Sequence, residues 1–154
     1  MSFKKILQTN DTEAIKLLLA DPFFNPSVGA NYEMRWASKY GYIKVVQLLL
    51  ADSRVDPSAH ENCAIRWASQ NDHTEVVKLL LSDPRVDPAS MNNRPIILSS
   101  ENGHTEIVRL LLGDPRVDPS VKENYPIKLA SQNGHTEVVK LLISDDREKY
   151  FQNI

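Results

Sequence analysis

The hydrophobic and polar positions of this chain repeat every 31 residues. The clearest copy is residues 72–88, which read Asp-His-Thr-Glu-Val-Val-Lys-Leu-Leu-Leu-Ser-Asp-Pro-Arg-Val-Asp-Pro. Residues 103–119 are a close copy, and looser copies begin at residues 10, 41 and 134. Equivalent residues confirm the spacing, since the following lie 31 apart: Trp36, Trp67, Leu98 and Leu129. A fixed period of about 20–50 residues is typical of proteins built from stacked repeats.

Each period contains two segments with helical patterning. In the third copy, the first segment runs from Asn62 to about Gln70 and is rich in small or apolar residues. The second segment has apolar residues at positions 76, 77 and 79–81, with charged residues between them. This apolar stripe is too wide for a helix with one neighbour, so it indicates a helix packed between two adjacent repeats. An Asp-Pro pair then ends the segment, because a residue before proline resists the α region.

An asparagine recurs just before the first segment of the copies, at Asn31, Asn62, Asn93 and Asn124. In two copies a proline follows two residues later, at Pro95 and Pro126. Asparagine is a preferred N-cap, and proline is tolerated in the first turn of a helix. We therefore interpret these asparagines as helix caps. The alternative is an asparagine in a left-handed turn.

These motifs resemble the ankyrin repeat. The resemblance covers about residues 3–145 and is clearest in Gly-His-Thr-Glu-Ile-Val-Arg-Leu-Leu-Leu at 103–112 and in the Tyr-Pro-Ile start at 125–127. It implies an all-α ankyrin-repeat solenoid of stacked helix-turn-helix pairs, with five units including terminal caps. We expect one domain, 1–154, with units at about 1–27, 28–58, 59–89, 90–120 and 121–154.

Two departures from the family pattern affect the expected contacts. The 31-residue period is shorter than the usual one of about 33, which should shorten the projecting connector between repeats. The threonine and histidine that begin the first helix in the family are also replaced. We expect the recurrent asparagines to make the hydrogen bonds that this pair would have made.

Composition and charge exclude several classes of protein. The net charge of −2 and the pI near 6.1 give no general attraction to nucleic acid or to acidic membranes. The longest apolar runs are too short to cross a bilayer, and no signal-peptide core follows the two lysines near the start. A single cysteine, Cys63, suits a reducing compartment. We therefore expect an intracellular, cytoplasmic protein, with a nuclear location as the alternative.

The candidate chemical groups favour structural roles. His73, His104 and His135 recur like a ligand set, but stacked helices lie roughly 8–10 Å apart, too far for shared zinc ligands at about 2 Å. Their rings are expected to tie the interhelical turn to neighbouring backbone groups. Cys63 is interpreted as a packed residue at a helix start rather than a nucleophile. We therefore expect no cofactor, no metal and no enzymatic activity.

Charged residues also recur in the connectors. Arg54, Arg85 and Arg116 stand beside Asp56, Asp87 and Asp118, and follow Asp52, Asp83 and Asp114. Exposed ion pairs contribute only about 0–1 kcal/mol each. We interpret these rows as a structural edge of the stack rather than as a docking site.

Function is expected where the copies differ, because a repeated residue serves the stack and a varied residue is free for recognition. One varied column lies in the connectors and contains His60, Glu61, Met91, Asn92, Lys122 and Glu123. A second column ends the first helix and contains Lys39, Tyr40, Gln70, Asn71, Glu101, Asn102 and Gln132. In ankyrin-like proteins such positions line the concave side and the finger tips. We expect a protein partner to bind there, with the chain acting as an adaptor or scaffold.

Two alternatives remain at the level of sequence. The chain could be a self-associating structural module, since little sequence follows the apolar residues Leu141–Ile143. A monomer with weak C-terminal self-association is expected, with Tyr150, Phe151 or Ile154 folding over this end. A small-molecule binder or enzyme is the other alternative. For Trp36 and Trp67, semi-buried packing is favoured over a role as binding hot spots.

Overall fold

The structure is a computed structural model that describes residue 6 and residues 11–145. This described part contains nine helices, α2 to α10, and no strand. The chain divides into two compact units, Met1–Val86 (unit 1) and Asp87–Ile154 (unit 2). The predicted all-α class is confirmed.

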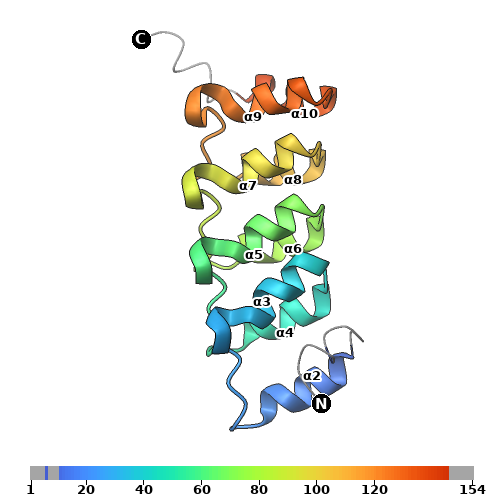
Figure 1. Cartoon of the computed structure of the whole chain (residues 1–154), viewed down its shortest axis with the longest axis vertical. Coiled ribbons are helices and arrows are strands. Elements are labelled where there is room, and N and C mark those ends of the chain that lie inside the picture. The colour runs from blue at the N-terminus through green and yellow to red at the C-terminus, as the bar shows by residue number, and fades with distance from the viewer. Residues whose placement is uncertain (1–5, 7–10, 146–154) are drawn as a thin grey trace. The chain divides into compact units, whose positions relative to one another are not determined.

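Within the described residues, unit 1 contains helix α2 followed by two helix pairs. Its helices are α2 (Thr12–Ala20), α3 (Val28–Tyr40), α4 (Ile43–Ala51), α5 (Ala59–Gln70) and α6 (Thr74–Leu81). Helix α3 packs against α5, and α4 packs against both α2 and α6 (Figure 1). The pairs α3–α4 and α5–α6 are therefore stacked, as the repeat pattern predicts.

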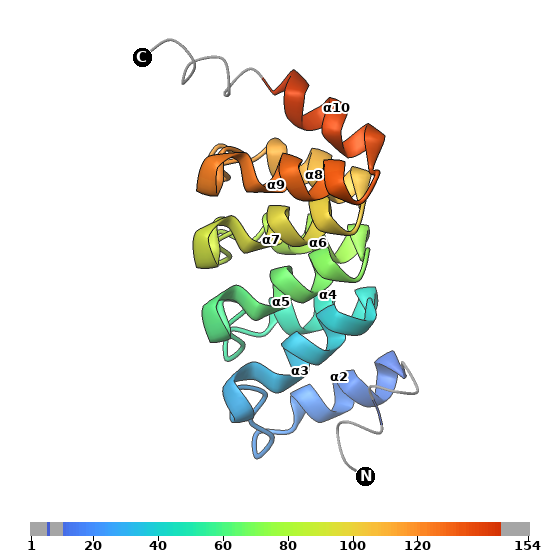
Figure 2. The ribbon, with the colours of Figure 1, turned by 45° about the horizontal axis from the view of Figure 1, so that its top comes forward.

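Unit 2 repeats this arrangement with two further pairs. Its helices are α7 (Ser90–Glu101), α8 (Thr105–Leu112), α9 (Val121–Gln132) and α10 (Thr136–Ser144). Helix α7 lies beside α9, and α8 packs against α10 (Figure 2). The stacked helix pairs confirm the expected fold, while the boundaries of five repeat units stay a prediction.

The centre of the apolar stripe is buried in the second helices α6 and α8. In α6, Val76, Val77 and Leu80 are fully buried, and in α8 Ile107, Val108 and Leu111 are likewise buried. Each large aliphatic side chain that leaves water contributes roughly 1.5–3 kcal/mol. These helices therefore form the apolar centre of each unit.

A tight left-handed turn joins the two helices of each pair. The turn residues have positive φ: Gly41 (72°), Asp72 (60°), Gly103 (75°) and Gly134 (76°). The residue after each turn donates its backbone N–H to a carbonyl five residues earlier, as from Tyr42 to Ala37 at 2.9 Å. This is the Schellman pattern that ends many helices.

The connectors hold an unusual left-handed segment, which we call the left-handed triplet. Three consecutive residues in each of α5, α7 and α9 have φ between 51° and 64°: His60–Asn62, Met91–Asn93 and Lys122–Asn124. At the equivalent place before α3's right-handed part, Gly29 and Asn31 also have positive φ. The right-handed helices thus begin at residues 32, 63, 94 and 125.

The triplets overturn the interpretation of the asparagines as N-caps. Each asparagine is the last member of its triplet, with left-handed φ rather than the extended conformation typical of an N-cap. The alternative, an asparagine in a left-handed turn, is correct. Pro95 and Pro126 lie in the first right-handed turn, where a missing N–H costs nothing.

Two of the sequence predictions concern residues near the ends of the chain. The truncated first helix, expected from about Phe3 to Gln8, lies outside the described residues except for Ile6, which is helical and buried. The expected cover from Tyr150, Phe151 or Ile154 also lies outside them.

Candidate functional site

Within each compact unit, an asparagine side chain connects one connector to the next. The Oδ1 atom of Asn31 accepts a hydrogen bond from the backbone N–H of Asp56 at 2.8 Å. Asn93 accepts one from Asp118 at 2.7 Å. Both asparagines are buried, so these bonds fix the spacing of successive connectors. Asn31 and Asn93 therefore supply linking hydrogen bonds of the kind expected for the recurrent asparagines, whereas the Oδ1 atom of Asn124 has no hydrogen-bond partner within the described residues.

Histidine side chains connect the interhelical turns. The Nε2 atom of His73 donates to the carbonyl oxygen of Lys39 at 2.9 Å, and His135 donates to that of Glu101 at 3.0 Å. The His73 ring also lies so close to Gly41 that an added Cβ there would be 2.5 Å from Nδ1. These contacts confirm the predicted structural role. Over the described residues, no group of three or more His, Cys, Asp or Glu could hold a metal ion.

The recurring arginines act as links too. Arg85 pairs with Asp83 at 2.6 Å and donates to the carbonyl oxygens of Val55 and Leu50, at 2.8 and 3.2 Å. Arg54 pairs with Asp52 in the same way and reaches back to Leu19 and Phe24. The hydrogen bond from Arg85 holds the pKa of the Asp83 carboxyl below its ordinary value.

This arrangement explains the charge rows predicted from the sequence. Arg54, Arg85 and Arg116 each pair with the aspartate two residues before them. The guanidinium groups of Arg54 and Arg85 also donate to carbonyls at and after the end of an earlier helix. The rows are therefore structural, as expected, and their strength comes from the backbone contacts more than from the exposed ion pairs.

Aromatic and cationic side chains gather along α3 and α5. We call this set the aromatic stripe; it comprises Tyr32, Trp36, Tyr40, Tyr42 and Trp67, with Arg35 and Lys39. The ring centroids of Tyr32 and Trp36 are 5.7 Å apart, those of Trp36 and Tyr40 are 4.5 Å apart, and those of Tyr40 and Tyr42 are 6.2 Å apart. The first three rings are four residues apart, so they lie along one face of α3.

Two cations join α3 to Trp67 of α5. The Arg35 guanidinium lies 5.9 Å from the Trp67 ring centroid, and the Lys39 ammonium lies 5.3 Å from it. Arg35 also donates to the carbonyl of Gly29 at 2.8 Å, which orders the connector before α3. Tyr40 is 43% exposed, while Trp36 and Trp67 are half-buried. The aromatic stripe is thus packed in place at Trp36 and Trp67, and Tyr40 is its solvent-exposed member.

The connector residues predicted to bind a partner are all exposed. They occupy the first two places of their triplets: His60 and Glu61, Met91 and Asn92, Lys122 and Glu123. The asparagine in the third place is buried at Asn62 and Asn93 and half-buried at Asn124. The left-handed backbone therefore separates the recognition candidates from the linking residue within three consecutive positions.

The predicted residues at the helix ends are less uniform. Tyr40, Gln70, Asn71, Asn102 and Gln132 are exposed, while Lys39 and Glu101 are half-buried. The side-chain amides of Asn71 and Asn102 donate to carbonyls of their own helices, at 2.8 and 2.7 Å. These two asparagines therefore have a structural task at the helix end.

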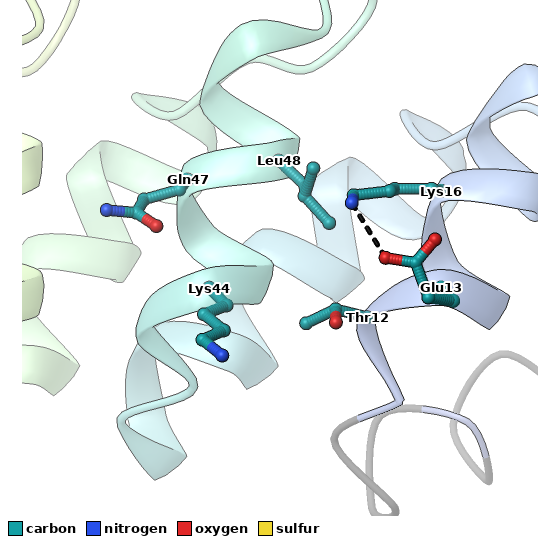
Figure 3. A pocket seen from close by; sticks show the side chains of 6 residues that line it. All are labelled: Thr12, Glu13, Lys16, Lys44, Gln47 and Leu48. Atoms are coloured by element: carbon teal, nitrogen blue, oxygen red, sulfur yellow. Dashed lines mark hydrogen bonds and ion pairs between the residues drawn. The ribbon is translucent and has the colours of Figure 1, made fainter.

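A groove lies between α2 and α4, and the sequence pattern alone does not predict it. It encloses about 420 Å³ and is lined by Thr12, Glu13, Lys16, Lys44, Gln47 and Leu48. Figure 3 shows Leu48 directed toward the ion pair between Lys16 and Glu13. The signal was present in the sequence, because the place of Lys44 holds glutamate in the four other copies.

Two remaining observations concern chemistry and membranes. Cys63 is a free thiol that is 4% exposed, which agrees with a packed residue. Within residues 11–145, no helix combines the length and apolarity needed to cross a bilayer.

Comparisons with known proteins agree with the repeat pattern. Two overlapping segments, residues 5–92 and 67–153, match a family model described as ankyrin repeats (3 copies). Together they span nearly the whole chain. No curated protein matches the chain.

Proposed function

The chain belongs to the ankyrin-repeat family, whose members are generally protein–protein interaction modules and typically not catalysts, and we propose that it is an adaptor or scaffold. It binds a protein partner through two sets of residues. One is the exposed pair in each left-handed triplet, and the other is the end of each first helix. No catalytic step and no cofactor are needed for this function.

The aromatic stripe is the observation that carries the proposal. Binding energy in protein interfaces concentrates in a few tyrosine, tryptophan and arginine side chains that lie in ordered surroundings. Tyr40 presents 43% of its surface to solvent while Trp36 packs behind it at 4.5 Å. A ring held in this way loses little conformational freedom when a partner covers it. Tyr40 is therefore the proposed anchor.

The variation among the triplets supports a role for the connectors. Their exposed pairs carry a different chemistry in each copy: His60–Glu61, Met91–Asn92 and Lys122–Glu123. The backbone conformation is the same in all three. A constant backbone that presents different side chains suits the recognition of a partner. The variation of these side chains brings no benefit for the stacking of the repeats.

The test is affinity capture from native cytosol with the wild type beside a Tyr40→Ala, Gln70→Ala, Glu101→Ala triple variant. The proposal expects the triple variant to lose the partner that the wild type recovers. Tyr125→Ala is the matched control, because Tyr125 is 39% exposed but lies outside the stripe. Equal recovery by the wild type and the triple variant contradicts the proposed surface.

The proposal includes an intracellular location and a monomeric state. A buried free thiol and the absence of a membrane-crossing helix from residues 11–145 support the location. Self-association is a second candidate, favoured by Ile143, which is 60% exposed on α10. A mass that rises with concentration in light scattering, and returns to the monomer mass in Ile143→Lys, supports self-association over the adaptor role.

A further inference from the structure

Helices α2, α6, α8 and α10 share an ion pair that neutralises the charge of their first turn. A glutamate in the first turn pairs with a base three residues later: Glu13 with Lys16 at 2.8 Å, Glu75 with Lys78 at 2.6 Å, Glu106 with Arg109 at 3.3 Å, and Glu137 with Lys140 at 2.7 Å. The glutamate also suits the positive end of the helix dipole. Sequence and local electrostatics thus agree in α2, α6, α8 and α10.

Helix α4 departs from this pattern at both positions. Lys44 stands where the other copies have glutamate, and Gln47 stands where they have a base. Within the described part of the chain, Lys44 has no ion-pair partner. A cation in the first turn of a helix is also disfavoured by the dipole. Lys44 therefore weakens its own helix and leaves one positive charge uncompensated.

This charge lies in the groove between α2 and α4. Lys44 and Leu48 are four residues apart, so they share one face of α4, and both line the groove. On the facing helix, Lys16 is held by Glu13 (Figure 3). The groove lining contains two lysines and one glutamate, so its net charge is +1. It combines an unpaired cation with an adjacent apolar side chain.

We propose that the groove between α2 and α4 binds an acidic segment of a protein partner. A carboxylate of the segment pairs with Lys44, in place of the intrachain pair that α4 lacks. A neighbouring apolar side chain of the segment packs on Leu48 in the groove. A volume of about 420 Å³ accommodates amino-acid side chains as well as the charge, so a peptide fits this groove better than a small inorganic anion. The groove uses different helices from the aromatic stripe, and its occupant is independent of what Tyr40 contacts.

The test uses three probes and NMR of the full chain, following the Lys44 ammonium and Leu48 methyl signals. The first probe is a 14-residue helix-forming peptide, acetylated and amidated, with glutamate and leucine four residues apart on one face. The second has glutamine in place of every glutamate, and the third is inorganic phosphate. The variant is Lys44→Glu with Gln47→Lys, which restores the ion pair of the other copies. Because that change suits the helix dipole, the variant should be at least as stable as the wild type, so lost binding cannot be ascribed to unfolding.

We expect the acidic peptide to shift both signals, and to bind the double variant about fivefold more weakly or worse, since attraction becomes repulsion. Added salt should weaken the wild-type complex. Equal shifts with the glutamine peptide, or no shift at Lys44 and Leu48 with any probe, overturn the proposal. Shifts from phosphate as large as those from the acidic peptide also overturn it, because they identify a small-anion site. Tyr40→Ala should bind the acidic peptide normally, which separates this result from the test of the aromatic stripe.

Discussion

The side chain of Asn93 accepts a hydrogen bond from the backbone N–H of Asp118, 25 residues later in the chain, at 2.7 Å. Asn93 ends a left-handed triplet and is buried, with 9% of its surface exposed. One residue thus performs two tasks, since asparagine tolerates the left-handed region and its amide joins neighbouring connectors.

The first prediction concerns this bond. Asn93→Ala should lower the free energy of unfolding by about 0.5–1.5 kcal/mol, because the backbone N–H of Asp118 loses its acceptor in this part-buried contact. The control is Asn124→Ala. Asn124 has the same left-handed conformation, but its Oδ1 has no hydrogen-bond partner among the residues that the structure describes. Chemical denaturation should show a clearly smaller loss for Asn124→Ala, and equal losses would mean that the hydrogen bond contributes nothing.

The second prediction concerns the contact between Gly41 and His73. Gly41→Ala adds a Cβ 2.5 Å from His73 Nδ1 to a residue with φ of 72°, so it should destabilise the protein by about 2–4 kcal/mol. Gly134→Ala has the same backbone cost at φ of 76° but no neighbour within 4 Å, and it should lose only about 1–2 kcal/mol. Thermal melts that rank the two variants in the opposite order would contradict a tight turn-to-ring contact.

The third prediction concerns acid stability. The pKa of Asp83 is lowered in the folded protein, chiefly by the side-chain hydrogen bond from Arg85. A lowered folded pKa contributes stability that is complete above the ordinary aspartate value of about 3.9 and is lost as the pH falls through the folded pKa. Asp83→Asn should therefore be less stable than the wild type at pH 7, and the difference should shrink below about pH 4. A difference that does not change with pH would show that the charge of Asp83 is irrelevant.

The fourth prediction concerns Glu33 in the first right-handed turn of α3. Burial raises its pKa, against smaller lowering effects from its own backbone and from Arg35. Its Oε2 is buried and has no hydrogen-bond partner within the described chain. The equivalent places hold Ala64, Pro95 and Pro126, so no stacking contact requires a carboxylate here.

For a raised folded pKa, the wild type loses stability as the pH rises from the ordinary glutamate value of about 4.3 through the folded value. Glu33→Gln should therefore increase the free energy of unfolding at pH 7. The gain should disappear below about pH 4, where Glu33 is neutral in both states. Denaturation curves at the two pH values check this, and a loss of stability at pH 7 would indicate a favourable role for the charge.

The fifth prediction concerns the left-handed triplets. Met91 has φ of 52°, a conformation that costs an ordinary residue about 1–2 kcal/mol and glycine almost nothing. Met91→Gly should stabilise unit 2 by about 1 kcal/mol or somewhat less, because the flexible unfolded chain offsets part of the gain. Met91→Ala keeps the backbone cost and should change little. Gly29 at the equivalent place shows that glycine is accepted there.

The period and the residue types predicted much of the fold. The wide apolar stripe of α6, the stop at Asp83-Pro84 and the structural role of His73 could be read from the sequence because each follows from local pattern or spacing. The triplets could not be predicted in full. Lys122 and Glu123 have no preference for positive φ, so their residue types do not indicate the left-handed conformation that they adopt. Of these three residues, only Asn124 is of a type that favours positive φ. Asparagine is also a preferred N-cap, and its place before a helical segment suggests that role instead.

The candidate surfaces show the same limit. The four-residue spacing of Tyr32, Trp36 and Tyr40 was visible, but whether those rings are covered depends on the packing of α5 against α3. The sequence alone shows that Lys44 differs from the glutamates at the equivalent positions of the other copies. Its proposed role depends on the groove between α2 and α4, which only the structure shows. Sequence differences between copies therefore indicate where to look, and the packing of the helices decides which differences are available to a partner.

The links between neighbouring connectors and turns share one property. Asn31 reaches the main-chain N–H of Asp56, His73 reaches the main-chain oxygen of Lys39, and Arg85 reaches that of Val55. In every case a side chain of one repeat forms a hydrogen bond with the peptide backbone of another repeat. The backbone offers these N–H and C=O groups whatever side chain the residue carries. These hydrogen bonds therefore place no demand on the side chain of the residue that they contact. Substitution of that side chain can alter the surface of a repeat and leave the bond to its neighbour in place.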